Sequence, residues 1–169
     1  MRTMDVRTPR AAVLLGALLA SSTIGGLCGP SPAPPAPGPS STCTEGAPPA
    51  DGQPMIELSD PETGATLEEG HTLLVEHGAQ GGSHFMVAAR QYSTSAGTWT
   101  YTFTLVRILP DGTEQEDGSN NAAVEACGPG WTATTSPVFL YGSAGPGTLR
   151  VRAENGGATL TDEVMVNLE

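Results

Sequence analysis

The clearest pattern in the chain is an alternation of apolar residues and threonines over 98–105. Every second residue there is aromatic or aliphatic, namely Trp99, Tyr101, Phe103 and Leu105, and the intervening residues are threonines. Because successive side chains of a strand point to opposite faces, this pattern predicts a half-buried β-strand with its apolar face against a core.

Shorter runs of the same kind follow residue 54, and turn-forming Gly, Pro, Asp and Asn separate them. They cover 55–58, 72–76, 85–92, 137–141, 148–153 and 163–168. The acidic residues Glu114, Glu116 and Asp117 and the pair Asn120-Asn121 read as solvated turn and loop. We therefore predict an all-β fold over 55–169, an immunoglobulin-like antiparallel β-sandwich of about seven strands.

The C-terminal residues predict a closing β-hairpin. Leu149 and Val151 alternate with arginines, a Gly-rich turn follows, and Val164, Val166 and Leu168 alternate with Met165 and Asn167. This stretch resembles the last two strands of bacterial Ig-like and PKD-like domains, which implies the fold and no ligand.

Residues 1–27 predict an export signal. Three arginines precede an apolar run from Ala11 to Ala20, which is shorter than the roughly 20 residues that span a bilayer. Gly25-Gly26-Leu27-Cys28 resembles the lipobox of bacterial lipoproteins, with Leu27 where a small residue is expected. We expect lipidation of Cys28 and attachment to the membrane through that lipid, and cleavage that releases a soluble periplasmic or secreted chain is the alternative.

Residues 28–54 predict a disordered, Pro-rich linker. They contain nine prolines and almost no large apolar residue, so the segment is expected to stay extended between anchor and domain. With Cys28 carrying lipid, Cys43 and Cys127 remain, and an oxidising compartment favours a disulfide between them. A free Cys43 in the linker is the alternative.

The net charge of the chain argues against a nucleic-acid partner. Without the export segment the chain has four arginines, no lysine and seventeen acidic residues, a net charge of −13. Such a surface repels phosphate backbones, so we expect no nucleic-acid partner and consider a protein or glycan at the cell surface instead.

A short motif in the middle of the chain resembles a known group. Residues 77–84 read His-Gly-Ala-Gln-Gly-Gly-Ser-His, and an apolar strand follows them. This G-x-Q-G-G-x-H pattern resembles a group of uncharacterised myxobacterial lipoproteins with a Pro-rich tether and one sandwich domain. The resemblance implies location and fold, since the group has no assigned biochemical activity. Gly81 or Gly82 is expected to take a positive φ in this loop.

The same stretch offers a candidate metal site. His77 and His84 flank the loop and could face each other across a hairpin, Met86 shares a strand face with His84, and His71 lies upstream. Imidazole and thioether ligands in an exported sandwich suit copper. The competing interpretation is that His84 begins a strand and Met86 fills the core.

Enzymatic motifs are missing from the sequence, which has no nucleophile elbow, HExxH, P-loop or dinucleotide fingerprint. We therefore expect a non-catalytic binding or structural module of the bacterial envelope, with no cofactor. A copper-type metal-binding sandwich using His77, His84 and Met86 is the alternative, and a small hydrolase ranks below both.

Overall fold

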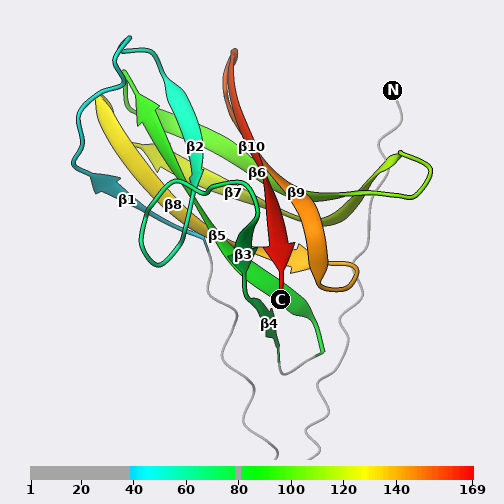
Figure 1. Cartoon of the computed structure of the whole chain (residues 1–169). Coiled ribbons are helices and arrows are strands. Elements are labelled where there is room, and N and C mark those ends of the chain that lie inside the picture. The colour runs from blue at the N-terminus through cyan, green and yellow to red at the C-terminus, as the bar shows by residue number, and fades with distance from the viewer. Residues whose placement is uncertain (1–38, 79–80) are drawn as a thin grey trace, which may run out of the picture. The chain divides into compact units, whose positions relative to one another are not determined.

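The computed structural model describes residues 39–78 and 81–169, and within them the fold is all-β (Figure 1). The strands are β1 (Ser40–Thr44), β2 (Met55–Ser59), β3 (His71–Leu73), β4 (Val75–His77), β5 (Ser83–Ser93), β6 (Gly97–Ile108), β7 (Glu114–Ala126), β8 (Gly130–Leu140), β9 (Gly145–Asn155) and β10 (Ala158–Leu168). The predicted all-β class is confirmed. None of the described residues forms a helix long and apolar enough to cross a membrane.

The strands form one hydrogen-bonded sheet that folds over into two layers. Layer A contains β1, β8, β5, β2 and β4, and layer B contains β7, β6, β9, β10 and β3. The layers join where Gly118 and Ser119 of β7 pair with Leu140 and Phe139 of β8. Strand pairs are antiparallel except β3 with β10. This is the predicted sandwich, and the described part of the chain contributes ten strands to it rather than about seven.

The core lies between the layers and is made by alternate residues of the long strands. Its largest fully buried apolar side chains include Phe85 of β5, Tyr101 and Phe103 of β6, Leu149 of β9 and Leu168 of β10. The alternation predicted over 98–105 is confirmed, because Trp99, Tyr101, Phe103 and Leu105 are all buried there. The predicted hairpin at the C-terminus is also present as β9 and β10.

The linker expected over 28–54 contains a strand that belongs to the sheet. β1 pairs with β8 from Ser40 opposite Thr135 to Thr44 opposite Trp131. A Cys43–Cys127 disulfide ties β1 to the end of β7, as the cysteine count predicted. The all-β unit therefore begins before residue 55, and composition missed this because β1 is entirely exposed and polar. The export segment and Cys28 lie outside the described residues.

β7 corrects a second expectation. Glu114, Glu116, Asp117, Asn120 and Asn121, predicted as turn and loop, all lie in this strand. Its composition has low β-propensity, yet it pairs with β6 along nearly its whole length, and tertiary pairing outweighs propensity in strands.

The predicted strand over 72–76 is interrupted at Leu74, where the chain leaves layer B as β3 and enters layer A as β4.

We predict that Gly118→Ala lowers the free energy of unfolding by about 1–3 kcal/mol, the usual range for overpacking. A Cβ at Gly118 would lie 2.6 Å from the carbonyl oxygen of Phe139, so β7 and β8 would have to separate where the layers join. Gly82→Ala is the control, because nothing lies within 4 Å of a Cβ there. Urea unfolding of both variants measures the difference, and equal stability of Gly118→Ala and wild type would contradict it.

Candidate functional site

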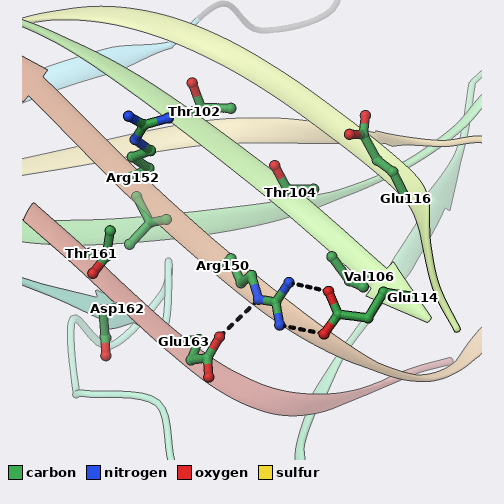
Figure 2. A pocket seen from close by; sticks show the side chains of 11 residues that line it. Thr102, Thr104, Val106, Glu114, Glu116, Arg150, Arg152, Thr161, Asp162 and Glu163 are labelled. Carbon is green, nitrogen blue, oxygen red and sulfur yellow. Dashed lines mark hydrogen bonds and ion pairs between the residues drawn. The ribbon is translucent and has the colours of Figure 1, made fainter. Parts of the chain in front are cut away.

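The outer face of layer B carries an open groove of about 900 Å³ (Figure 2). Its lining comes from the outward positions of four strands: Thr102, Thr104 and Val106 of β6, Glu114 and Glu116 of β7, Arg150 and Arg152 of β9, and Thr161 and Glu163 of β10, with Val151 and Asp162 beside them. We call this surface the layer B groove.

Strand register explains why these residues gather. Thr104 lies opposite Arg150, which in turn lies opposite Glu163, so the three form one row across the layer. A β-bulge between Leu105 and Val106 shifts the pairing with β7 and brings Glu116 opposite Val106. Bulges bend a strand and increase its twist, so the end of the β6–β7 hairpin supplies one wall of the groove.

Arg150 connects three strands at the centre of the groove. Its Nη1 and Nη2 donate to Glu114 Oε2 and Oε1 at 2.7 and 2.8 Å, and its Nε donates to Glu163 Oε2 at 2.8 Å. The hydrogen bonds that Arg150 donates to Glu114 and then to Glu163 raise the pKa of Arg150, and Arg150 in turn lowers the pKa of Glu114. Three of its donors are therefore occupied, and the guanidinium holds the groove's shape.

Arg152 is the more available cation of the groove. Within 39–78 and 81–169 it makes one ion pair, from Nη2 to Glu154 Oε1 at 2.7 Å, and its side chain is 57% exposed. Thr102 and Thr161 flank it in the same row, so a ligand would meet hydroxyl groups beside a positive charge. This arrangement suits polar recognition by strands, whose positions are more rigid than those of loops.

The candidate metal ligands are dispersed. β4 and β5 pair His77 with Ser83 and Glu76 with His84, so the two imidazoles occupy opposite faces of the ribbon. The expectation that His77 and His84 face each other is wrong. His77 Nδ1 instead lies 2.9 Å from Ser83 Oγ.

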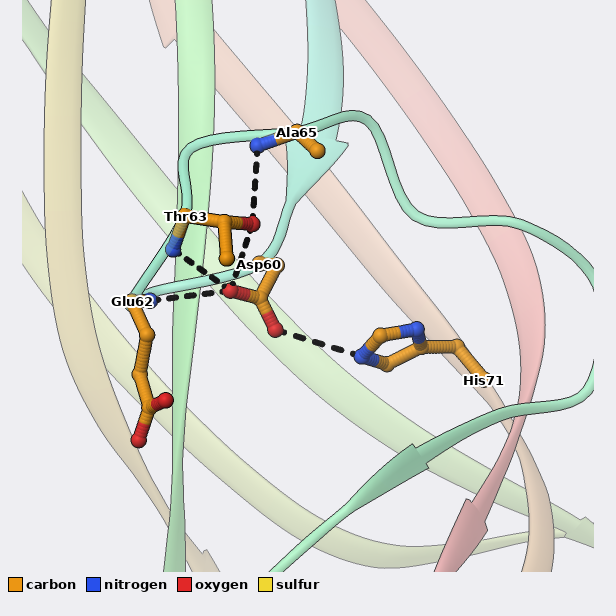
Figure 3. Close-up of polar contacts among 5 residues, drawn as sticks. All are labelled: Asp60, Glu62, Thr63, Ala65 and His71. Atoms are coloured by element: carbon orange, nitrogen blue, oxygen red, sulfur yellow. Dashed lines mark hydrogen bonds and ion pairs between the residues drawn. The ribbon is translucent and has the colours of Figure 1, made fainter.

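The remaining candidates fall into two places, His84 with Met86 on β5 and His71 on β3. His84 Nε2 is 3.3 Å from Glu76 Oε2 without the alignment of a hydrogen bond, and Met86 follows on the same face of β5. His71 Nε2 lies 3.2 Å from Asp60 Oδ2 (Figure 3). Across 39–78 and 81–169, no three His, Cys, Asp or Glu side chains gather so as to hold a metal ion.

Sequence reasoning did not find the layer B groove. Thr102 and Thr104 were recognised as the outer face of a strand, and Arg150 and Arg152 as outward positions of the closing hairpin. Their convergence with Glu114 and Glu116 depends on the bulge and on β7, which composition assigned to a turn. The sequence offered one indication of this groove, which is that Arg150 and Arg152 alternate with apolar residues on a predicted strand.

No protein-family model and no curated protein matches the chain. Among solved structures, the N-terminal domain of PorA is 13% identical, with a TM-score of 0.34, over 68% of this chain and 98% of that one. The CooA pilin subunit from enterotoxigenic Escherichia coli is 9% identical, with a TM-score of 0.37, over 68% and 97%. A β-glucosidase from Listeria innocua is 13% identical, with a TM-score of 0.35, over 68% and 16%. TM-scores this low carry no argument about function.

We predict that Asp60→Ala lowers the free energy of unfolding by about 1 kcal/mol or more, because Asp60 Oδ1 accepts hydrogen bonds from the backbone N–H groups of Glu62 and Thr63 and from Thr63 Oγ1. The exposed Glu62→Ala change is the control and should stay within about 0.5 kcal/mol.

These hydrogen bonds lower the pKa of Asp60 below its ordinary 3.8, and the bond from the Thr63 backbone N–H has the largest effect. Its charge therefore stabilises the fold above that pH, and the contribution is lost as pH falls through the lower folded value. Urea unfolding from pH 7 to pH 2 should show a smaller acid loss for Asp60→Asn than for wild type. Identical acid losses would contradict this role.

Proposed function

We propose that this protein is a non-catalytic binding module of the bacterial cell envelope and that the layer B groove is its binding face. The observation that carries the proposal is the groove itself, an open concavity of about 900 Å³ lined by side chains on paired strands. Sites built on strands hold their geometry without the ordering cost of a loop, which favours recognition of a partner.

The groove's charges support binding rather than catalysis. A general acid or base works best with a pKa near the operating pH. Here Arg150 holds the carboxylate of Glu114 in its ionised form by lowering its pKa, and it also binds Glu163. These groups are suited to hydrogen bonding a partner and poorly suited to moving a proton.

The partner that fits the groove is a polar polymer of the cell surface, a protein segment or a glycan. Threonine hydroxyls both donate and accept hydrogen bonds, and Arg152 adds donors with a positive charge. The net charge of −13 outside the export segment disfavours nucleic acid.

Location follows from the N-terminal residues. The export segment, the lipobox-like Gly25-Gly26-Leu27-Cys28 and the resemblance to myxobacterial lipoproteins together support an outer-membrane lipoprotein anchored through Cys28. The Cys43–Cys127 disulfide fits such an oxidising compartment. A soluble periplasmic or secreted form remains the alternative outcome of processing.

Filling the groove should abolish binding. We predict that Thr161→Trp lowers co-sedimentation of the purified protein with the insoluble envelope fraction of its own bacterium at least fivefold, measured in chains that carry Cys28→Ala so that no lipid anchor contributes. Thr159→Trp is the matched control, since Thr159 is on the same face of β10 and does not line the groove. Treating the envelope with protease before the assay should abolish binding if the partner is a protein and leave binding unchanged if it is a glycan. Equal sedimentation of both variants and wild type would contradict the assignment of the groove.

Anchoring through Cys28 predicts that labelled palmitate enters the wild-type chain and that Cys28→Ala blocks it and releases the protein from membranes. Multiple acyl chains on one cysteine anchor stably, whereas a single chain binds marginally. Cys43→Ala is the control and should still take up label. Wild-type protein without label, with an N-terminus upstream of Cys28, would show a soluble exported protein instead.

A further inference from the structure

Layer B ends in an open strand edge that the layer B groove does not use. β7 pairs with β8 only at Gly118 and Ser119, after which β8 continues in layer A. From Asn120 to Ala126, the side of β7 that faces away from β6 has no hydrogen-bonded strand beside it among residues 39–78 and 81–169. We call residues 120–126 the β7 edge.

The direction of the backbone groups shows which residues are open along this edge. In an antiparallel sheet the N–H and C=O of one residue point to the same side, and successive residues alternate. The Asn121 N–H donates to Asn120 Oδ1 at 2.9 Å. The Cys127 N–H donates to Thr132 Oγ1 at 2.7 Å. Both N–H groups therefore point away from β6, and the odd-numbered residues between them share that direction.

Ala123 and Glu125 thus present their backbone N–H and C=O groups to the open side, and both residues are exposed. Unpaired backbone groups of this kind are a template for another strand. Natural edge strands are blunted by lysine, proline or a bulge. The β7 edge contains neither lysine nor proline, and the bulge of this hairpin lies outside it, between Leu105 and Val106.

The edges on the opposite side of the sandwich are covered. In β2, the Leu58 N–H donates to Asp162 Oδ2 at 2.7 Å, and the Leu58 carbonyl accepts from the Leu67 N–H at 3.0 Å. In β10, the Met165 N–H donates to Glu69 Oε2 at 3.0 Å. The fold therefore occupies backbone groups with side chains and loops on that side, and leaves the β7 edge ready to pair.

The chain's own linker is a poor strand for this edge. Residues 29–39 directly precede β1 and contain prolines at 30, 32, 34, 35, 37 and 39. Proline has no N–H to donate to a ladder. β1 itself already pairs with β8, and only five residues of it form a strand. A partner strand for the β7 edge therefore has to come from another chain.

We propose that the β7 edge pairs antiparallel with the β7 edge of a second copy of this chain, about a two-fold axis at Ala123. In this register Ala123 lies opposite Ala123 of the second copy, and Asn121 lies opposite Glu125 of the second copy. An amide can donate to a carboxylate, so the register satisfies the charged residue of the edge. Residues 118–124 are uncharged, so this segment limits self-repulsion in an acidic chain.

Other registers are worse. A pairing centred on Glu125 would place two carboxylates directly opposite each other, which is destabilising. A pairing centred on Val124 would use Cys127, whose N–H already donates to Thr132. A shift toward the N-terminus would bring the second copy against Ser119, where β8 occupies the edge. The register centred on Ala123 uses only residues whose edge is open.

The resulting dimer has a defined geometry. Its two-fold axis is normal to the paired strands, so layer B continues from one copy into the next and the two outer faces of layer B point the same way. The contact is short, and interfaces of small area are weak and reversible. The pairing does not depend on what the layer B groove binds.

Sedimentation equilibrium of purified chains that carry Cys28→Ala tests the association without a lipid anchor, from about 10 µM to about 1 mM, the range of weak binding. Wild-type β7 should give a reversible monomer–dimer equilibrium. Ala123→Lys should raise the dimer Kd about fivefold or more, because two lysines meet at the axis. About 1 M NaCl should restore part of the affinity by screening. Thr159→Lys, on β10 at the far side of layer B, is the matched control and should leave the Kd unchanged.

Cysteine cross-linking tests the register. Ala123→Cys should form an interchain disulfide on mild oxidation, because opposite residues of a hydrogen-bonded pair lie about 5.5 Å apart between Cα atoms. Asn121→Cys and Thr159→Cys are the controls and should not cross-link. The proposal is overturned if the wild-type chain stays monomeric to about 1 mM. It is also overturned if Ala123→Lys dimerises as wild type does, or if Ala123→Cys cross-links no more than the controls. Protection of the Ala123 and Glu125 amides from hydrogen exchange in a monomer would assign the edge to the chain's own linker instead.

Discussion

The short pairing between β7 and β8 is the contact on which the two-layer arrangement depends. Beside it, the bulge leaves Asp117 outside the β6–β7 ladder, and its carbonyl accepts a hydrogen bond from the Tyr141 N–H at 2.8 Å. Its carboxylate accepts from Arg107 Nε at 2.8 Å, and Arg107 also donates to the backbone carbonyls of Ser143 and Pro146. Since both side chains are mostly buried, losing either one would leave an uncompensated charge.

The layer B groove and a shallower concavity on the outer face of layer A both follow from this junction. In layer B the bulge displaces the β6–β7 hairpin so that Glu114 reaches Arg150, and the outward-facing Val106 becomes buried beside that pair. In layer A, β8 pairs with β7 only at its C-terminal end, which leaves the rest of that edge for β1. β1 then contributes Ser40 and Thr42 to that concavity of layer A. Part of the segment that composition assigns to a tether thus belongs to the folded sheet.

Strands with a buried apolar face could be predicted from the sequence, and strands without one could not. Strands with a buried apolar face, such as β6 and β10, were found because period-2 alternation reports which face meets the core. β1 and β7 were missed because pairing partners, and not their own composition, place them in the sheet. The disulfide followed from cysteine parity, which is independent of local structure. Neither concavity was predictable, because each depends on register across four strands and one bulge. The His77–His84 interpretation failed for the same reason, since a one-residue difference in register reverses the face.

The layer B groove and the concavity of layer A differ in the charge of the side chains that line them. The layer B groove has charged side chains from three strands and only partly compensated carboxylates, so binding there would include Coulomb interactions that salt screens over about 8–10 Å. The concavity on the outer face of layer A is lined largely by hydroxyl-bearing side chains, and its Arg90 contacts Glu57 at 3.3 Å. The two outer faces of the sandwich therefore differ in charge, because each face is fixed by the strands of its own layer.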